Sequence, residues 1–561
     1  MLERGGIDST LEVPDTIHGL LMARIDRLAD EAKRVLQTAS VLGREFSARL
    51  LNAVCRDCGT LPPHLSELKR LEFLYERAGT EEPLYVFKHA LTQDVAYESL
   101  LISRRQALHE ATGRALEDLY PDRTEEYCEV LAHHYSRSAN GDKAFEYLVL
   151  ANQKAEKANA MLEAKGHFDE AMQLLDGLPD TEANQRRRIS LLARQGWIMQ
   201  PLLKVPEYYE LLIRYEPLAI RVADQGVLGA FYAWLGHCQW WFGDYDRAIE
   251  TDTKAAQLCE AGGNTEEAVH AYTNLAWSYY SRGDYPETLA RIPHVSRALD
   301  RQFTLRSYVI FQTAVVLALS WLGQWDRAVE EAQKALRVAE EFSDNSMISF
   351  AAWAISLAYA SRNDLTRAVE YGELGVQKAP TPGDQAWAQA VLALAWCRSG
   401  EPTKAAEALI PIVAMLRSVR MVWGETYTLF LGEAYWRAGR YDEARETLEE
   451  CLGIVEARGM KCYAAYAHRL LGEIALSANP GQLAERVATP HFEKSVALSQ
   501  EIGAENELAL AYAGYGRLHK QLGRIAKARD YLTRALEIFE RLGTLIEPDK
   551  VRQELATLPA R

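Results

Sequence analysis

Apolar residues recur along most of the chain at the spacing of an amphipathic helix. In the segment 16–28, TIHGLLMARIDRL, the apolar side chains on one helical face are Ile17, Leu20, Leu21, Ile25 and Leu28. A second helix is predicted for DEAKRVLQTASVL and ends at Gly43. Nearly every segment after residue 100 has the same period, so the pattern predicts an all-α protein.

The period changes once, near residue 74. There LYERA and LYVFK flank the turn segment GTEEP, which predicts a short β-hairpin before a helix that starts near Ala90. Helical patterns at 47–54 and 62–74 precede this hairpin. Three or four helices with a two-stranded wing are the outline of a winged helix, which we predict for residues 15–125.

A repeated segment organises the chain after residue 180. Each copy holds a small residue, a turn residue seven positions later and, in most copies, an alanine five positions after the turn. The turn residues, spaced by 40, 40, 40, 37 and 39 positions, are Gly243, Gly283, Gly323, Asn363, Gly400 and Gly439. Small side chains let two antiparallel helices approach closely, and Gly or Asn tolerates the left-handed backbone that ends a helix. Each copy is therefore predicted to be a helix hairpin.

The segments AYTNLAWSYYSRGDY and LFLGEAYWRAGRY resemble the tetratricopeptide repeat, whose residues Leu-Gly, Tyr, Gly-x-Tyr and Ala follow in this order. The ordinary repeat has about 34 residues, whereas the longer period found here is similar to that of MalT-type regulators and large signalling ATPases. The resemblance covers residues 183–545 and implies an α-solenoid of tetratricopeptide-like helix hairpins. One copy departs, because SANPGQLAERVATPHFEKS inserts extra residues before its second helix, and we expect a loop or a bend there.

Two further helical hairpins are predicted upstream of the repeats. They cover 128–158 and 163–175, with Gly141 and Gly166 at their turns. The resulting division of the chain is a remnant linker (1–14), the winged-helix arm (15–125), connecting helical hairpins (126–180), the repeat superhelix (181–545) and a tail (546–561).

The arm carries a second, more specific resemblance. EVPDTIHGLLMARIDRL, VLQTASVLGREF and VFKHALTQDVAYESLL resemble the arm that follows the nucleotide-binding core of STAND-class signalling ATPases. They are most similar to bacterial proteins in which a class III adenylate or guanylate cyclase precedes such an ATPase and tetratricopeptide repeats. The resemblance implies that a histidine at the start of the last arm helix contacts the ADP phosphates. His89 matches that histidine, although Lys88 and Ala90 stand where relatives in other kingdoms have Met and Asp.

The catalytic parts of such proteins are missing from this sequence. No GxxxxGK[ST] occurs to cradle phosphates, and the metal-binding aspartates of a cyclase have no αβ context here. We therefore expect a chain that starts downstream of the ATPase core, is not an enzyme and holds no cofactor, ADP or ATP being expected only in a full-length relative. The alternatives are a fragment of a cyclase or ATPase enzyme and a MalT-like transcription regulator.

Composition and charge limit the classes of partner that the chain is expected to bind. Lys plus Arg total 63 against 78 Asp plus Glu, a net charge of −15 that disfavours nucleic acid and anionic membranes. The predicted winged helix has the same sign, since residues 1–120 hold 15 basic and 19 acidic residues, 15 − 19 = −4. Eight cysteines in 561 residues fit a reducing cytoplasm. The uncharged segment 307–325 is long enough to cross a bilayer, but its polar residues and its phase with the repeats favour a solenoid helix.

Two clusters contain residue types that often bind metals. Cys55-x-x-Cys58 is half of a zinc site with no second pair at a suitable distance, and His133-His134 lies in a helix before a turn. Packing explains both, and no metal site is expected.

These observations predict a noncatalytic sensor or scaffold that binds a protein or peptide, with no nucleic-acid or membrane partner. The sequence leaves open whether the chain forms a homo-oligomer. The positions expected to face the concave surface of the superhelix are His237, Trp240, Trp241, Trp277, Tyr280, Leu317 and Trp321 in early repeats, and Glu433, Trp436, Arg437, Arg517 and Lys520 in later ones. The alternative is that several of these tryptophans are packed between adjacent repeats.

Overall fold

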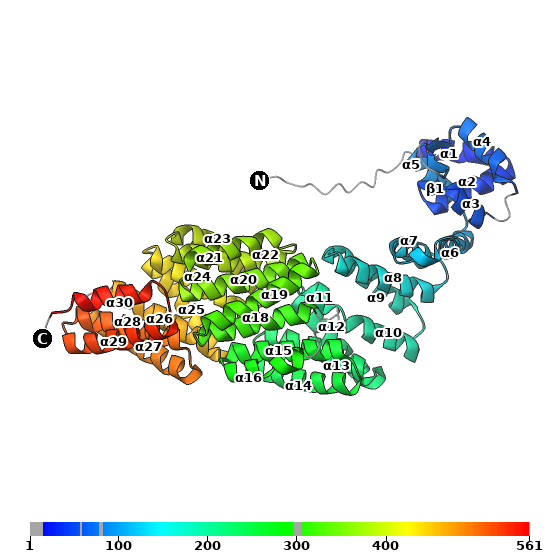
Figure 1. Cartoon of the computed structure of the whole chain (residues 1–561). Helices are drawn as coiled ribbons and strands as arrows, with labels where there is room; N and C mark the ends of the chain where they lie inside the picture. The colour runs from blue at the N-terminus through cyan, green and yellow to red at the C-terminus, as the bar shows by residue number, and fades with distance from the viewer. Residues whose placement is uncertain (1–14, 56–58, 78–81, 297–304, 479–480, 560–561) are drawn as a thin grey trace. The chain divides into compact units, whose positions relative to one another are not determined.

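The computed structural model describes residues 15–55, 59–77, 82–296, 305–478 and 481–559. The chain divides into two compact units, Met1–Asp180 and Thr181–Arg561, and helices make up most of both (Figure 1). Among the described residues, no helix is both long and apolar enough to span a bilayer.

The first unit begins with a small domain of helices and one sheet. Its elements are α1 (Asp15–Asp26), α2 (Asp30–Leu42), β1 (Glu45–Ser47), α3 (Ala48–Val54), α4 (Leu61–Arg70), β2 (Leu74–Arg77), β3 (Leu84–Phe87) and α5 (Ala90–Glu98). The strands are antiparallel in the order β1-β3-β2, with Phe46 opposite Tyr85 and Tyr75 opposite Val86. The predicted hairpin is confirmed as β2 and β3. The sequence pattern does not predict β1, because three residues are too few to show an alternation.

Helices pack against this sheet. The core includes Ile25 from α1, Leu36 from α2 and Phe87 from β3, all without exposed surface. The apolar face predicted for α1 is only partly buried, because Ile17 and Leu20 remain 45% and 67% exposed.

The rest of the first unit is helical. It contains α6 (Ile102–Leu119), η1 (Pro121–Arg123), α7 (Cys128–Ser136), α8 (Gly141–Lys157) and α9 (Met161–Gly177). The prediction of a turn at Gly166 is wrong, since this glycine lies inside α9. The turn falls instead at Asn159, which has a left-handed φ of 57°. One glycine costs a helix about 1 kcal/mol, and the good helix formers around Gly166 outweigh that cost.

The second unit is an all-α solenoid of tetratricopeptide-like hairpins. It starts with α10 (Glu182–Leu192), α11 (Gly196–Met199) and α12 (Val205–Val222). The following hairpins are α13 (Gln225–Trp241) with α14 (Tyr245–Ala261), α15 (Thr265–Arg282) with α16 (Tyr285–Ala290) and α17 (Ile292–Ser296), α18 (Leu305–Trp321) with α19 (Trp325–Glu341), α20 (Asn345–Arg362) with α21 (Leu365–Lys378), α22 (Pro382–Arg398) with α23 (Pro402–Ser418), α24 (Glu425–Arg437) with α25 (Tyr441–Ala457), α26 (Lys461–Ala478) with α27 (Gly481–Ile502), and α28 (Glu505–Gln521) with α29 (Ile525–Leu542). A 3-10 turn, η3 (Val422–Gly424), precedes α24, and α30 (Glu547–Ala556) ends the unit.

The small residues of the repeat let each helix pair pack closely. A Cβ added to Gly432 would lie 2.5 Å from a methyl carbon of Leu448 on the partner helix. Asn363 ends α20 with a left-handed φ of 66°, as predicted for a turn residue. In the segment SANPGQLAERVATPHFEKS, where a loop or a bend is expected, residues 481–490 form the first turns of α27 and residues 479–480 lie outside the described residues. The extra residues lengthen that helix to 22 residues.

The solenoid coils so tightly that one superhelical turn contacts the next. Trp241 Nε1 donates to the carbonyl oxygen of Val419 at 3.1 Å, and the hydroxyls of Tyr280 and Tyr463 lie 2.8 Å apart. Farther along, Arg362 Nε donates to the Gly543 carbonyl at 3.2 Å. The partners are separated by 178, 183 and 181 positions in the chain. One superhelical turn therefore takes between four and five hairpins, and side chains of two turns meet in the interior.

Candidate functional site

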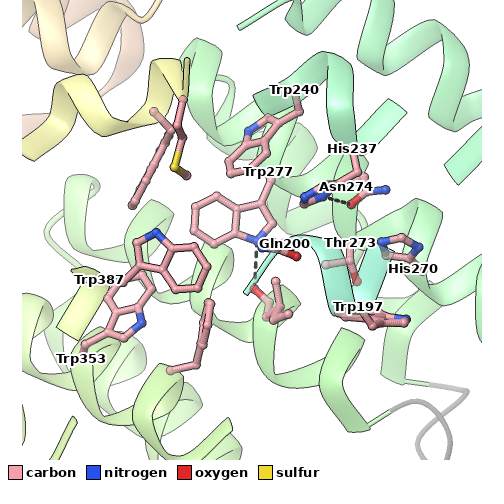
Figure 2. Close-up of a pocket in the computed structure, with 14 residues that line it drawn as sticks. Trp197, Gln200, His237, Trp240, His270, Thr273, Asn274, Trp277, Trp353 and Trp387 are labelled. Atoms are coloured by element: carbon pink, nitrogen blue, oxygen red, sulfur yellow. Dashed lines mark hydrogen bonds between the residues drawn. The ribbon is translucent and has the colours of Figure 1, made fainter. Parts of the chain in front are cut away.

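A cavity lies in the interior of the second unit, where the first helices of the early hairpins meet η3 (Figure 2). It is narrow, with a cavity volume of about 30 Å³ for water-sized molecules. We call it the tryptophan pocket, because its aromatic lining is Trp197, Trp240, Trp277, Phe350, Trp353, Trp387 and Trp423. Its remaining lining is Gln200, His237, His270, Thr273, Asn274, Ile310 and Met421.

The tryptophan pocket is closed by contacts between two superhelical turns. Trp240 and Trp277 come from α13 and α15, and Trp423 comes from η3 one turn later. The ring centroids of Trp277 and Trp423 are 5.4 Å apart with the rings nearly perpendicular, and those of Trp240 and Trp277 are 5.5 Å apart. Edge-to-face pairs of this kind stabilise the wall beyond the apolar area that they bury.

A chain of hydrogen bonds fixes the orientation of the imidazole in this wall. Asn274 Nδ2 donates to the Ala233 carbonyl at 2.8 Å and to Asp252 Oδ1 at 3.2 Å. Its Oδ1 must therefore accept, and it lies 3.4 Å from His237 Nδ1. Burial lowers the pKa of His237 to about 3, so the ring is neutral and its proton sits on Nδ1. His237 Nε2 is left as a buried acceptor without a hydrogen-bond partner.

The wall near Trp197 also holds neutral histidine. Burial lowers the pKa of His270 to about 3, and its ring centroid lies 4.2 Å from that of Trp234. His270 Nδ1 lies 3.3 Å from Glu267 Oε2, and burial raises the pKa of this carboxyl group to about 7. No Lys, Arg, Asp or Glu side chain lines the tryptophan pocket within the described part of the chain, so its surface is aromatic and uncharged.

A second interior cavity, of about 70 Å³ for water-sized molecules, lies farther along the solenoid, and we call it the polar pocket. It is lined by Tyr280, Trp321, Arg398 and Glu507, among others. Its charges are paired: Arg398 Nη2 lies 3.0 Å from Glu433 Oε2, and Arg469 Nε lies 2.5 Å from Glu507 Oε1. The polar pocket is thus held by ion pairs between repeats.

The structure divides the predicted concave residues between these two cavities. His237, Trp240 and Trp277 line the tryptophan pocket, while Tyr280, Leu317 and Trp321 line the polar pocket. Trp241 lines neither cavity, because its indole is buried at the contact between superhelical turns.

The concave positions predicted for the later repeats lie among the ion pairs of the second unit. Trp436 is half-buried, and Arg437 Nε donates to Glu433 Oε1 at 2.8 Å. Arg517 bonds to Glu473, and Lys520 Nζ lies 2.6 Å from Thr557 Oγ1. Their role in partner binding remains a prediction, as it does for the early positions.

The alternative of packing between repeats also has support. Trp240 and Trp277 are only 6% and 7% exposed, and each indole N–H already donates to a neighbouring repeat, at Ser281 Oγ and the Ile310 carbonyl. These tryptophans are packing residues that also form a cavity wall. Sequence reasoning missed Trp197, Trp353, Trp387 and Trp423, because only the length of the superhelical turn brings them to the same cavity.

His89, the candidate nucleotide contact, occupies the N-cap position of α5. Its side chain is exposed and makes no capping hydrogen bond to the helix. The neighbouring Lys88 Nζ lies 2.9 Å from Glu72 Oε2. His89 thus offers one imidazole donor at a helix N-terminus, which suits a phosphate oxygen.

The two clusters of metal-ligand residue types differ in placement. Cys55 is buried, and Cys58 lies outside the described residues. His134 is buried with its Nδ1 3.0 Å from His109 Nδ1, and burial lowers the pKa of His134 to about 3. Among the described residues, no group of three or more His, Cys, Asp or Glu side chains has an arrangement that could hold a metal ion.

Several solved structures are similar to this chain. A Rap protein complexed with competence and sporulation factor is 15% identical, covering 71% of this chain and 99% of its own, with a TM-score of 0.42. A STAND protein with a tetratricopeptide repeat sensor from Pyrococcus horikoshii is 12% identical, covering 96% of this chain and 66% of its own, with a TM-score of 0.36. A Rap conjugation gene regulator in complex with the Phr* peptide is 14% identical, covering 72% and 97%, with a TM-score of 0.33.

Sequence comparison finds a relative and two family matches. An uncharacterized protein of Rhizobium meliloti (strain 1021) is 24% identical over 182 residues, which are 32% of this chain but only 18% of that relative. The tetratricopeptide repeat family matches residues 426–450 and 482–541. The chain therefore contains tetratricopeptide repeats.

Proposed function

We propose that this chain is a noncatalytic sensor or scaffold module that binds a peptide or a protein segment inside its repeat superhelix. The observation that carries the proposal is the tryptophan pocket, an uncharged aromatic cavity with an unpaired acceptor in its wall. Pockets that bind ligands are mostly apolar, with a few placed polar groups. The polar pocket in the same interior offers hydroxyl and amide groups to the rest of such a segment.

Selection from a displayed random-peptide library on the immobilised full chain tests this proposal. We expect enrichment of peptides whose affinity, measured by calorimetry, falls when Trp240 or Trp277 is replaced by Ala. Trp396→Ala is the control, since this half-buried indole lies under Lys404 outside both cavities. Lost stability of the two interior variants with unchanged peptide affinity would contradict the proposal.

Our proposal extends to residues 15–125 of the first unit, which we assign as the winged-helix arm of a STAND-type ATPase and cyclase system. The helix and strand order from α2 to β3, with the sheet order β1-β3-β2, supports the winged helix. The exposed imidazole of His89 at the N-terminus of α5 supports a contact with the ADP phosphates, because a helix N-terminus favours anions.

The test of the arm uses a protein in which an ATPase core precedes this chain. His89→Ala should weaken ADP retention and raise basal output while the circular dichroism of the arm stays unchanged. Lys88→Ala is a matched control, because it removes an exposed charge next to His89 and leaves the imidazole. Equal ADP affinity of the wild type and His89→Ala would refute the assignment.

A further inference from the structure

We propose that the structure is the closed, resting form of the superhelix, and that the coil opens between its two superhelical turns to admit a peptide. The inference rests on the proposed function and names how access to the interior is regulated. The tryptophan pocket and the polar pocket leave only about 30 and 70 Å³ for water-sized molecules. One water needs about 10–15 Å³ of such volume. Each cavity therefore holds a few waters, and a peptide side chain enters only if the walls separate.

The two superhelical turns meet along a regular set of contacts, which we call the seam. In these contacts, the turn inside an early hairpin lies against the start or the end of a helix in a later hairpin. A Cβ added to any of three turn glycines would lie within 3.1 Å of a side chain across the seam, the pairs being Gly243 with Val422, Gly283 with Ile502, and Gly323 with Leu542. The turns therefore touch closely, but at helix ends.

Backbone hydrogen bonds also cross the seam. Gly383 N donates to the Pro201 carbonyl at 3.2 Å, and Leu545 N donates to the Arg362 carbonyl at 2.9 Å. In a solenoid, each repeat is stabilised by its own helix pair and by its neighbours along the chain. The seam adds contacts beyond these, so it can open while every hairpin stays folded, as a local opening of lower free energy than global unfolding.

The last contact of the seam holds a strained turn. Next to Leu545, Ile546 has a φ of 67° and a ψ of −53°, and Glu547 N donates to the Leu545 carbonyl at 2.7 Å. These values define a γ-turn of the rare, strained kind, and a β-branched residue at its centre adds to the strain. Release of Leu545 from Arg362 would let this turn relax, so the strain favours opening.

A peptide that binds only the open coil competes with the seam. Its apparent affinity is the affinity of the open form multiplied by the fraction of chains that are open. Loosening the seam should therefore tighten peptide binding, and locking the seam should abolish it. A peptide that bound the closed coil would respond to neither change.

The first experiment compares two native cysteines in the unmodified full chain. Cys462 on α26 lies at the seam close to Tyr285 on α16, whereas Cys259 on α14 packs within its own hairpin, 2.5 Å from a Cβ added to Gly229. Neither cysteine has exposed surface, and burial raises the pKa of each thiol to about 12. Pulsed alkylation with N-ethylmaleimide, read by mass spectrometry, should modify Cys462 about tenfold faster than Cys259. Equal rates would overturn the inference.

The second experiment locks the seam with a disulfide. A Cβ added to Gly283 would lie 3.6 Å from the Cβ of Lys461, and a disulfide needs about 3.5–4.5 Å. In the full chain with Gly283→Cys and Lys461→Cys, oxidation should abolish binding of the library peptides selected on the wild type, and dithiothreitol should restore it. Gly283→Cys alone is the control for the left-handed φ of 80° at this turn. Equal peptide affinity of the oxidised and reduced double variant would contradict the opening.

The third experiment loosens the seam without touching either cavity. Leu542→Ala removes the side chain that packs against Gly323, and Leu542 lines neither pocket. It should raise both the alkylation rate of Cys462 and the affinity for the selected peptides about threefold. Leu536→Ala is the matched control, because this half-buried leucine of the same helix packs within the last hairpins and should change neither quantity. Unchanged values in Leu542→Ala would count against a seam that opens as one unit.

The outcomes separate this inference from the proposed function. If the selected peptides bind the oxidised and reduced double variant equally, the proposed function stands and the opening is wrong. If the library yields no peptide on any form of the chain, the proposed function is wrong, and the seam then has no role in admitting a peptide.

Discussion

The superhelix interior has two parts, an aromatic half around the tryptophan pocket and a charged half around Glu433. A buried glutamate is protonated at the aromatic half and ionised in the charged half. Glu267 on α15 lies beside the aromatic half, where burial raises the pKa of its carboxyl group to about 7. Burial alone would also raise the pKa of Glu433 on α24, but the guanidinium groups of Arg398 and Arg437 hold it well below its usual range. The repeat supplies the same kind of helix in both places. Side chains from neighbouring repeats decide whether the interior is neutral or charged.

This difference indicates which half has polar groups available for a ligand. In the charged half, Glu433 already accepts from Arg398, Arg437 and Tyr466, so a charged ligand would have to break existing pairs. In the aromatic half, the acceptor on His237 and the indole N–H groups of Trp353 and Trp423 have no partner. The charged half therefore stabilises the coil, and the aromatic half keeps groups for a ligand.

Removing the central carboxylate of the charged half should have the largest effect. Glu433→Ala leaves Arg398 and Arg437 without their partner in the interior, and breaking a buried pair in this way costs about 3–5 kcal/mol. Urea unfolding followed by circular dichroism measures the loss.

The matched control for this change is Glu443→Ala. Glu443 pairs with Arg440 on the exposed surface, so we expect no measurable shift of the urea midpoint. An effect of Glu433→Ala as small as that of Glu443→Ala would show that the interior pairs do not hold the coil.

The stability that Glu267 contributes should depend on pH in the opposite sense to the stability that Glu433 contributes. The folded chain binds a proton on Glu267 between pH 4.5 and about 7, whereas the unfolded chain releases it. The stability that this proton contributes is fully present below pH 4.5 and is lost as pH rises through 7, a change of about 3 kcal/mol. Glu433, with its lowered pKa, contributes stability above the unfolded pKa that is lost as pH falls.

Glu267→Gln isolates this effect, because an amide does not titrate. The variant should become more stable than the wild type as pH rises from 5 to 8, by an amount read from urea midpoints at both pH values. Glu250→Gln, an exposed change on α14, is the control and should leave the difference constant. A pH-independent difference between wild type and Glu267→Gln would show that this carboxyl group is ionised throughout.

The sequence predicted the repeats but not the cavities. Turn residues such as Gly323 and Asn363 act within one hairpin, so their spacing reveals the hairpin directly. Trp423 meets Trp240 only because a superhelical turn takes between four and five hairpins, and that length depends on small angles between hairpins. Gly166 and residues 481–490 have a related explanation, because in both places a turn-like sequence lies within a helix that packing stabilises.

Removal of one hydroxyl group tests the contact between superhelical turns. Tyr280 OH lies 2.8 Å from Tyr463 OH and accepts from Trp321 Nε1 at 3.2 Å, so Tyr280→Phe should destabilise the second unit by about 1–2 kcal/mol. Tyr427→Phe is the matched control, because its buried hydroxyl has no hydrogen-bond partner and its removal should cost nothing. Equal losses for the two variants would show that the Tyr280 bonds do not join the turns.

The smallest expected effect is a difference in ligand affinity between a variant of the aromatic half and a variant of the charged half. Trp240→Phe shortens an indole in the wall of the tryptophan pocket, while Trp436→Phe makes the same change in the charged half, where the indole is half-buried beside Arg437. Losing part of one aromatic contact should weaken binding of the selected library peptides about threefold for Trp240→Phe and leave it unchanged for Trp436→Phe. Urea midpoints of both variants show whether either change also disturbs the fold. A loss of affinity in Trp436→Phe as large as in Trp240→Phe would mean that the ligand contacts both halves. The aromatic half would then not be the only part of the interior that binds it.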